Sequence, residues 1–374
     1  MKILTVLGTR PEIIRLSLVI EQLDRSAEHV LVHTGQNYDD RLDGLFFREL
    51  GVRAPDLNLG ARGDSFGEQV GQILAGVERV LREQRPDRVL ILGDTNSGLA
   101  AIVARRLGIP VYHMEAGNRC YDDRVPEEVN RRVIDHASTV LLPYTERSRA
   151  NLLREGIAGD RIYVTGNPIL QVIEAHRDAI RDSEVLHELR LEPERYFVVT
   201  MHRAENVDRE DRLRELVGAL ERLHREHGHP VVCSLHPRTR ARIERFGVDI
   251  DRAGLRFLEP LGLFDFVRLE QDAFCLLSDS GTVQEEACLF GVPNVTLRDM
   301  TERPETVECG SNYLAGTSSD AIVDGVRHVV GRRGGWTPPA EYVRPLVAET
   351  VVRILLSYRP PDAAEIEWRE GVRQ

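Results

Sequence analysis

Short runs of apolar residues alternate with amphipathic stretches along the chain of 374 residues. Such runs, when polar residues do not alternate within them, predict strands that are buried on both faces of a parallel sheet. The first series consists of Lys2–Leu7, Val30–His33, Arg88–Leu92, Pro110–His113 and Thr139–Leu142. The second series consists of Tyr196–Thr200, Pro230–Ser234, Leu255–Leu258, Ala273–Leu277 and Asn294–Leu297. Two series of strands predict two separate sheets.

The stretches between these strands have the spacing of amphipathic helices. Pro11–Leu23 begins with proline, which suits the first helical position, and Glu210–His224 repeats leucine and valine at helical intervals. Strands that alternate with helices predict doubly wound α/β layers. Because 374 residues exceed what one hydrophobic core usually organises, we expect two domains. The break is expected near Pro168–Ser183, after a strand that ends at Thr165.

Composition and charge exclude several classes of protein. The formal net charge of −11 and the pI near 5.6 argue against a nucleic-acid binder and against a protein of anionic membranes. The apolar run at the N-terminus is too short for a secretory leader, and no stretch reaches membrane-spanning length. We therefore expect a cytoplasmic protein that binds neither nucleic acid nor a membrane.

Missing motifs argue against bound cofactors and metals. Lys2 is the only lysine, which excludes a Walker A phosphate loop and disfavours a Schiff-base mechanism. No Gly-x-Gly occurs, so the dinucleotide fingerprint is missing. The five cysteines form no Cys-x-x-Cys pair, and His224, His227 and His229 lack further ligands nearby. We therefore expect no cofactor, no metal site and no disulfide framework.

Polar residues gather where the predicted strands end. In open α/β sheets, ligands bind beyond the carboxyl ends of the strands. These ends carry Gly8–Glu12 with Arg15, Gly93–Ser97, Glu115–Arg119 and Pro126–Arg131 in the first series, and Thr200–Arg203, Ser234–Arg238, Ser278–Glu286 and Thr301–Glu305 in the second. Asp94 could instead be a helix N-cap, and His202 and His236 could be core histidines, although their place at two strand ends favours ligand contact.

One of these segments has the pattern of a phosphate site. A strand, then Ser280–Thr282, then a helix exposes backbone N–H groups at the positive end of that helix. The serine could merely cap the helix. Because Arg10, Arg15 and Arg303 also lie on predicted loops or helix starts, a diphosphate site is the better interpretation. Glu286, about a turn and a half into the helix, is either a surface glutamate or an acceptor for sugar hydroxyls.

A set of short motifs occurs in a fixed order: GTRPEIIR, HTGQN, GDTNS, HMEAGNR, PEEVNRR, TGNP, TMHRAEN, HPRT and SDSGTVQEE…TERPE. Each is weak alone, but together they resemble the non-hydrolysing UDP-N-acetylglucosamine 2-epimerases from Lys2 to about Thr317. The resemblance implies the GT-B architecture, α/β with two Rossmann-like doubly wound parallel-sheet domains that face each other across a cleft. It implies an N-terminal domain of residues 1–170, to which a C-terminal helix at about 350–374 packs back, and a UDP-binding domain of residues 171–349. It also implies a homodimer.

The reaction of this family inverts C2 of an N-acetylhexosamine, whose C2–H is not adjacent to a carbonyl group. One route oxidises a neighbouring hydroxyl and requires a nicotinamide cofactor, whose binding fingerprint is missing here. The other route eliminates UDP as the C2 proton leaves, and then adds a proton from the opposite face and UDP again. That route needs acid/base groups, a cationic clamp for the diphosphate and no cofactor, and the strand-end residues provide them.

The resemblance assigns roles to individual residues. The acid/base carboxylates of the family correspond to Asp94, Glu115 and Glu127, and its active-site histidine corresponds to His202. Residues that bind the UDP-sugar correspond to Arg10, Arg15, His236, Leu261, Phe266, Ser280, Gly281, Thr282, Glu286 and Arg303. Leu261 and Phe266 match contacts to uracil and are otherwise ordinary core residues. Which carboxylate removes the C2 proton stays open.

Departures from the family pattern concern the sugar more than the reaction. Arg15 stands where many members have lysine, and Thr282 replaces the second glycine of a frequent Ser-Gly-Gly. Asn37 stands where regulated bacterial members often have histidine, which argues against allosteric activation by UDP-N-acetylglucosamine. The motifs HTGQNY, GNRC and DSGT resemble the subgroup that forms UDP-N-acetyl-L-fucosamine, a 6-deoxy sugar.

Three functions remain open from the sequence. The preferred one is a UDP-N-acetylhexosamine 2-epimerase, acting on the UDP-N-acetylglucosamine and UDP-N-acetylmannosamine pair or on a 6-deoxy sugar. A GT-B glycosyltransferase would share the fold alone and transfer the sugar to an acceptor. A nucleotide-sugar-binding protein without catalysis is disfavoured, because three carboxylates in one cleft are costly without a use.

Overall fold

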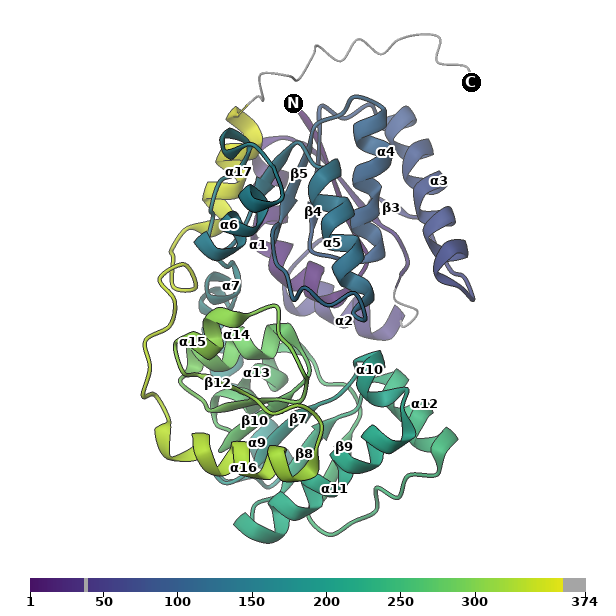
Figure 1. Cartoon of the computed structure of the whole chain (residues 1–374). Coiled ribbons are helices and arrows are strands. Elements are labelled where there is room, and N and C mark those ends of the chain that lie inside the picture. The colour runs from purple at the N-terminus through teal and green to yellow at the C-terminus, as the bar shows by residue number, and fades with distance from the viewer. Residues whose placement is uncertain (37–39, 359–374) are drawn as a thin grey trace. The chain divides into compact units, whose positions relative to one another are not determined.

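The computed structural model of the chain describes residues 1–36 and 40–358 and divides into two compact units. The first unit comprises Met1–Val172 together with the segment that begins at Arg344, and the second comprises Ile173–Val343. Each unit contains its own six-stranded parallel sheet with helices between the strands (Figure 1). The prediction of doubly wound α/β domains is confirmed.

The first unit alternates strands and helices along the chain. Its strands are β1 (Lys2–Leu7), β2 (Glu28–His33), β3 (Leu57–Asn58), β4 (Arg88–Leu92), β5 (Val111–Met114) and β6 (Val140–Leu142). Its helices are α1 (Arg10–Ser26), α2 (Asp40–Glu49), α3 (Phe66–Gln84), α4 (Ala100–Arg106), α5 (Pro126–Ala137), α6 (Glu146–Arg154) and α17 (Val347–Ser357), with short 3-10 turns η1 (Asn96–Leu99) and η2 (Gly159–Arg161). Helix α7 (Ile169–Ala175) crosses the division between the units.

The second unit repeats the pattern. Its strands are β7 (Phe197–Thr200), β8 (Val231–Ser234), β9 (Leu255–Leu258), β10 (Cys275–Ser278), β11 (Asn294–Thr296) and β12 (Asn312–Leu314). Its helices are α8 (Arg177–Arg181), α9 (Val185–Glu188), α10 (Ala204–Val207), α11 (Glu210–His227), α12 (Pro237–Phe246), α13 (Leu263–Gln271), α14 (Gly281–Phe290), α15 (Pro304–Glu308) and α16 (Ser319–Val329), with the 3-10 turn η3 (Val330–Arg332).

Both sheets have the same strand order. The first runs β3-β2-β1-β4-β5-β6 and the second runs β9-β8-β7-β10-β11-β12. Numbered within its own unit, each sheet therefore has the 3-2-1-4-5-6 order of the Rossmann fold. The winding reverses between β1 and β4 and again between β7 and β10, and ligands of such sheets bind in the crevice at that reversal. Ligand-binding and catalytic residues are therefore expected in the loops that follow these four strands.

In the first unit, helices α3, α4 and α5 cover one face of the sheet (Figure 1). Their apolar residues, among them Ile73, Ala101 and Ile134, share one buried cluster with Val6 and Ile91 of the strands. Helices α1 and α17 contact one another on the other face of the sheet (Figure 1). The helix predicted at Pro11–Leu23 is α1, and the proline stands in its first turn.

Helix α17 is bound to the first unit although it follows the whole second unit in the sequence. The side chain of Gln171 accepts a hydrogen bond from the backbone N–H of Ala348 at 2.9 Å and donates one to Glu349 Oε2 at 2.8 Å. The hydroxyl of Tyr112 on β5 donates to the carbonyl of Tyr358 at 2.6 Å. Residues 359–374, the remainder of the predicted C-terminal helix, lie outside the described residues.

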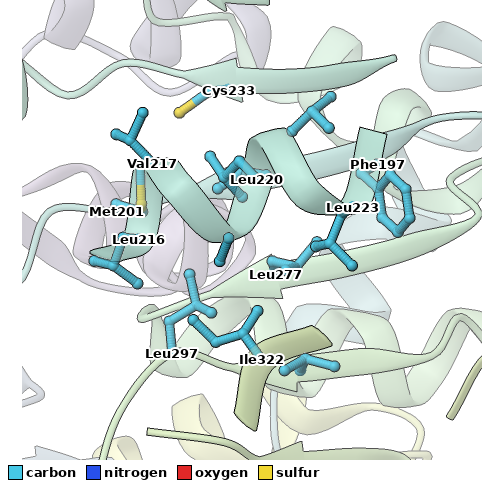
Figure 2. Packing of buried hydrophobic residues seen from close by; sticks show 14 of the residues in the cluster. Phe197, Met201, Leu216, Val217, Leu220, Leu223, Cys233, Leu277, Leu297 and Ile322 are labelled. Carbon is cyan, nitrogen blue, oxygen red and sulfur yellow. The ribbon is translucent and has the colours of Figure 1, made fainter. Parts of the chain in front are cut away.

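The core of the second unit is built around α11 (Figure 2). Leu216, Leu220 and Leu223 of this helix meet strand residues such as Phe197 and Leu277 in one buried cluster. The apolar repeat predicted from Glu210 onward is the buried face of this helix, which extends to His227. No helix among residues 1–36 and 40–358 is long and apolar enough to cross a bilayer.

The sequence pattern misses one edge strand of each sheet. The edge strands β3 and β12 have only two and three residues, too few for a clear apolar run, and neither was predicted. The strand predicted to end at Thr165 is wrong: Ile162 makes one isolated parallel bridge with Leu141. Tyr163 and Thr165 still donate backbone hydrogen bonds to the residues that end β6, so this segment is extended but too sparsely paired to form a strand.

Candidate functional site

The loops after β1, β2 and β4 approach one another closely in the first unit. A Cβ atom on Gly8 would stand 2.1 Å from Thr34 Oγ1 and 2.3 Å from Ser97 Oγ. These two hydroxyls hydrogen-bond each other at 2.8 Å, and Ser97 Oγ also donates to Gln36 Oε1 at 3.2 Å. Only glycine fits at position 8, because any side chain would separate these loops.

The carboxylate of Glu12 connects the loop after β1 with the loop after β4. Its carboxylate accepts hydrogen bonds from Gly8 N at 2.9 Å, from Thr9 Oγ1 at 2.8 Å and from Thr95 Oγ1 at 3.0 Å. Burial raises the pKa of Glu12 to about 7, and the hydrogen bonds offset only part of that effect. The sequence contained Glu12 in a motif but gave no sign of this role, because Thr95 lies far along the chain.

We expect Glu12 to make wild-type protein lose stability as the pH rises. Its folded pKa of about 7 lies above the unfolded value of 4.5, so the folded state holds the proton more tightly. The stabilisation is complete below pH 4.5 and is lost as the pH rises through about 7, a change of about 3 kcal/mol. Urea unfolding across this range should show wild type losing stability relative to Glu12→Gln. A constant gap would contradict the prediction, and Glu83→Gln on the exposed surface of α3 is the control.

Asp94 follows β4 and is held by α5. Its Oδ2 accepts a hydrogen bond from Arg131 at 2.6 Å, and its carbonyl accepts one from Asn130 Nδ2 at 3.0 Å. The other side of the Arg131 guanidinium contacts the buried Glu128 at 2.8 Å. The N-cap of the following 3-10 turn is Thr95, so the alternative role of Asp94 as a cap is wrong.

Glu115 follows β5 in a strained backbone conformation. Its φ of 65° lies in the left-handed region, which non-glycine residues rarely adopt outside functional sites and turns. Its Oε1 accepts a hydrogen bond from Asn118 Nδ2 at 3.1 Å, and its Oε2 lies 3.8 Å from the buried guanidinium of Arg15. Arg15, predicted to contact the diphosphate, therefore lies beside a predicted acid/base carboxylate.

The loop that carries Glu115 has its own support, which the sequence did not indicate. His113 Nδ1 and Asp135 Oδ1 are 2.9 Å apart, and Asp135 also accepts from the backbone N–H of Gly117 at 3.1 Å. Arg119 pairs with Asp135 at 2.8 Å. Burial opposes ionisation of Asp135, but His113 and Arg119 outweigh it and lower its pKa. This network fixes the turn after β5.

The other predicted residues of the first unit stand at the starts of helices. Glu127 is half-buried in the first turn of α5, on the helix whose Asn130 and Arg131 bind Asp94. Arg10 is the first residue of α1, and its guanidinium lies over the ring of Phe46, 5.8 Å from the centroid. Asn37 lies outside the described residues.

In the second unit, His202 is oriented by a buried aspartate. Asp279 Oδ1 lies 3.0 Å from His202 Nδ1, and Oδ2 accepts backbone hydrogen bonds from His202 at 3.0 Å and from Arg203 at 2.9 Å. Burial opposes ionisation of Asp279, but His202 and these hydrogen bonds outweigh it and lower the pKa to about 2. With Nδ1 turned to Asp279, Nε2 is the ring nitrogen that faces away. The rings of His202 and His236 are 5.6 Å apart.

The first turn of α14 has the geometry of an anion site. Ser280 is the N-cap but makes no side-chain cap, because its hydroxyl pairs with that of Thr282 at 2.9 Å. A Cβ on Gly281 would lie 3.6 Å from the Arg303 guanidinium carbon, so this buried cation stands beside the positive end of the helix. Arg303 is held there by an ion pair with the buried Glu285.

Three of the predicted residues of the second unit are buried or partly buried. Glu286 is 5% exposed, so the alternative of a surface glutamate is wrong. Its carboxyl faces that of Glu270 on α13, whose pKa is raised well above its usual range by burial and by Glu286. Leu261 and Phe266 are partly buried and pack against the apolar cluster around Tyr196, as ordinary core residues do.

The predicted residues thus form two groups, one on each unit. Arg10, Arg15, Asp94, Glu115 and Glu127 belong to the first unit. His202, His236, Leu261, Phe266, Ser280, Gly281, Thr282, Glu286 and Arg303 belong to the second. Within the part of the chain that the structure describes, no group of three His, Cys, Asp or Glu side chains is placed to hold a metal ion.

Known proteins resemble the chain over nearly its whole length. A family model described as UDP-N-acetylglucosamine 2-epimerase matches residues 21–356. A UDP-N-acetylglucosamine 2-epimerase of Methanocaldococcus jannaschii is 40% identical over 370 residues, which cover 95% of this chain and 99% of the relative. A UDP-2,3-diacetamido-2,3-dideoxy-D-glucuronate 2-epimerase of Pseudomonas aeruginosa is 37% identical over 342 residues, 89% of this chain and 93% of the relative.

A solved structure shares the fold as well. The UDP-GlcNAc 2-epimerase of Methanocaldococcus jannaschii, crystallised in complex with UDP-GlcNAc and UDP, superposes with a TM-score of 0.91 at 40% identity. The match covers 95% of this chain and 99% of that chain. The two Rossmann-like sheets are those of the GT-B architecture predicted from the sequence.

Proposed function

Because the chain belongs to the UDP-N-acetylglucosamine 2-epimerase family, a family of isomerases that invert C2 of a UDP-sugar, we propose that it interconverts UDP-N-acetylglucosamine and UDP-N-acetylmannosamine. The observation that carries this proposal is the buried Arg303 guanidinium beside the first turn of α14. A helix N-terminus and a cation together suit a diphosphate, which is both the handle of the substrate and the leaving group of the reaction.

We propose that inversion proceeds by elimination and re-addition. A base removes the C2 proton, the C2–H electrons form a C1=C2 double bond, and the C1–O bond breaks so that UDP leaves with its electron pair. A proton then adds to C2 from the opposite face, and UDP adds again at C1. The overall oxidation state does not change, so the route needs acid/base groups and a diphosphate clamp.

The residues of the two units support different parts of this route. We assign acid/base chemistry to the carboxylates Asp94, Glu115 and Glu127 and to the imidazole of His202. We assign the diphosphate to Ser280, Gly281, Thr282, Arg303, Arg10 and Arg15, sugar hydroxyls to Glu286, the uracil to Leu261 and Phe266, and a lining role to His236. Polarisation of His202 by the ionised Asp279 supports a role in proton transfer or in binding the leaving phosphate.

Proton NMR of the purified protein with UDP-N-acetylglucosamine in D₂O tests the proposal directly. We expect deuterium to replace the C2 proton while a second set of signals with manno configuration appears, without any added cofactor. Sugar transfer to an acceptor without C2 exchange would instead support the glycosyltransferase. Tight UDP binding without either reaction would support a binding protein.

The sugar itself is the open part of the proposal. The Pseudomonas aeruginosa relative is named for a diacetamido uronic acid, so members this similar differ in what the hexose carries. The motifs shared with the fucosamine-forming subgroup favour a 6-deoxy sugar as the second candidate. The same NMR experiment with a UDP-linked 6-deoxy N-acetylhexosamine decides between them: exchange with this substrate alone would reassign the sugar and leave the reaction as proposed.

We also propose a homodimer and a cytoplasmic location. All five cysteines are free thiols, as in a reducing compartment, and cell fractionation tests the location.

The proposed dimer surface includes helix α5. This helix exposes Val129 and Val133, one turn apart, with 50% and 38% of their surface accessible. Burying such an apolar pair in a partner subunit is favourable.

Val133→Glu is expected to weaken the proposed dimer, because it places a charge in an apolar contact. Sedimentation of wild type should give the mass of two chains, and the variant should shift toward one chain. Val343→Glu, at an exposed valine of the second unit, is the matched control and should remain dimeric. A monomeric wild type, or a variant that dimerises as well as wild type, would contradict this arrangement.

A further inference from the structure

Two thiols face each other in the second unit. Cys288 on α14 and Cys309, the residue that caps the C-terminus of α15, have their Sγ atoms 3.7 Å apart. Cys288 is buried, whereas Cys309 is partly accessible to solvent. From the sequence these two cysteines are separated by 20 residues and belong to no recognisable pair. The fold alone brings them together.

The surroundings of the pair make one sulfur the nucleophile. Cys309 Sγ lies 3.4 Å from Ser311 Oγ and 3.4 Å from the carbonyl of Thr306. The contact between the two thiols lowers the pKa of Cys309 and raises the pKa of Cys288. Cys309 therefore ionises more readily than Cys288, and it is partly exposed and next to a second thiol, which are the features of a redox-active cysteine with its resolving partner.

None of the other three thiols combines access to solvent with a neighbouring thiol in the same unit. Cys233 on β8 and Cys275 on β10 are fully buried, and burial raises the pKa of each. Cys120 is partly accessible to solvent, but it belongs to the first unit, whereas the other four cysteines belong to the second. Oxidation should therefore select the pair on α14 and α15.

We propose that Cys288 and Cys309 form a reversible dithiol–disulfide site, and that its oxidation weakens UDP binding. The Cys309 thiolate attacks one sulfur of a small-molecule disulfide such as oxidised glutathione, and the other sulfur leaves as a thiol after taking up a proton. Cys288 then loses its proton and attacks Cys309 sulfur, which expels the second glutathione thiol. Two electrons pass from the protein to glutathione, and one molecule of oxidised glutathione becomes two of the reduced form.

The effect on UDP follows from where the two cysteines lie, and this part rests on the proposed function. A disulfide requires an S–S distance of about 2.05 Å, so closing the present 3.7 Å between the sulfurs must move the two side chains and fix the end of α15 against α14. Arg303 is the N-cap of α15, and Gly281 is the first residue of α14. The bond therefore connects the two helices that carry the proposed diphosphate contacts, where misplacement by about 1 Å is costly.

The experiment treats the whole reduced protein with oxidised glutathione and counts its thiols after unfolding. We expect the count to fall from five to three in wild type. Peptide mapping should identify a Cys288–Cys309 link. Cys309→Ser has four thiols and should lose none, whereas Cys120→Ser has four and should fall to two. Dithiothreitol should restore the original count.

Calorimetry with UDP measures the consequence. Oxidised wild type should bind UDP about tenfold more weakly than reduced wild type, and oxidant should leave UDP binding by Cys309→Ser unchanged. Five thiols after treatment, or a link through Cys120, would overturn the site. A Cys288–Cys309 link with unchanged UDP affinity would overturn the coupling. Failure of the reduced protein to bind UDP at all would instead contradict the proposed function, because the thiol count does not depend on it.

Discussion

Replacing Glu115 with glutamine is expected to abolish exchange of the C2 proton, lowering the rate by about 10²–10⁴. The amide has nearly the shape of the carboxylate but cannot accept a proton at neutral pH. Its oxygen can still accept the hydrogen bond that Asn118 Nδ2 now donates to Glu115 Oε1 at 3.1 Å. The variant should therefore fold and retain the turn after β5, and it should lose only the exchange of the C2 proton.

The measurement is deuterium incorporation at C2 in D₂O, accompanied by calorimetry with UDP. We expect UDP affinity to stay within about a factor of three of wild type, because the amide keeps the shape of the side chain and the proposed contacts of Ser280, Gly281 and Arg303 to the diphosphate lie on the second unit. Glu127→Gln should behave in the same way. Glu83→Gln, exposed on α3, should exchange at the wild-type rate. Wild-type exchange in both the Glu115 and Glu127 variants would remove these carboxylates from the mechanism.

A substitution of Asp94 would test the proposed acid/base chemistry less specifically. Its carboxylate accepts a 2.6 Å hydrogen bond from Arg131, which also pairs with the buried Glu128. Removing the charge of Asp94 would leave Arg131 with an excess of positive charge and disturb the start of α5, where Glu127 stands. A loss of activity in an Asp94 variant would therefore mix catalysis with positioning, whereas the Arg15 guanidinium lies 3.8 Å from Glu115 Oε2, beyond hydrogen-bond distance.

Most strands, and the loops that carry the candidate site residues, could be predicted because both follow from the pattern of apolar and polar residues along the chain. Parallel strands buried on two faces give apolar runs, as at Arg88–Leu92, which is β4 to the residue. Loops at the carboxyl ends of such strands are where ligands bind, so Asp94, Glu115 and His202 could be singled out from their position alone. The edge strands β3 (Leu-Asn) and β12 (Asn-Tyr-Leu) were not predicted, because neither sequence forms an apolar run.

The supports of the site could not be predicted from the sequence, because their partners are far apart in the chain. Thr95 reaches Glu12 across 83 residues, and Asp279 reaches His202 across 77. Nothing local distinguishes Glu12 from a surface glutamate in the first turn of a helix. Burial is decided by the packing of other elements, which also explains why Glu286 is enclosed rather than exposed.

Removing the Arg303 side chain is expected to affect UDP binding and stability for separate reasons. Arg303→Met loses the cation beside Gly281, and charge-assisted hydrogen bonds are worth about 1.5–3 kcal/mol each, so UDP affinity should fall about tenfold to a hundredfold or more. The same change leaves the fully buried Glu285 without its ion-pair partner. An uncompensated buried charge costs about 3–5 kcal/mol of folding stability.

A second substitution separates the two effects. Arg303→Met combined with Glu285→Leu replaces the buried ion pair by apolar side chains, an exchange that is often neutral for stability. The double variant should therefore regain most of the unfolding free energy in urea while UDP affinity by calorimetry stays low. Arg327→Met, which breaks an exposed ion pair with Glu226, should change neither quantity appreciably. Recovery of UDP binding in the double variant would mean that Arg303 acts only through folding, and the diphosphate clamp would have to be sought among Arg10 and Arg15.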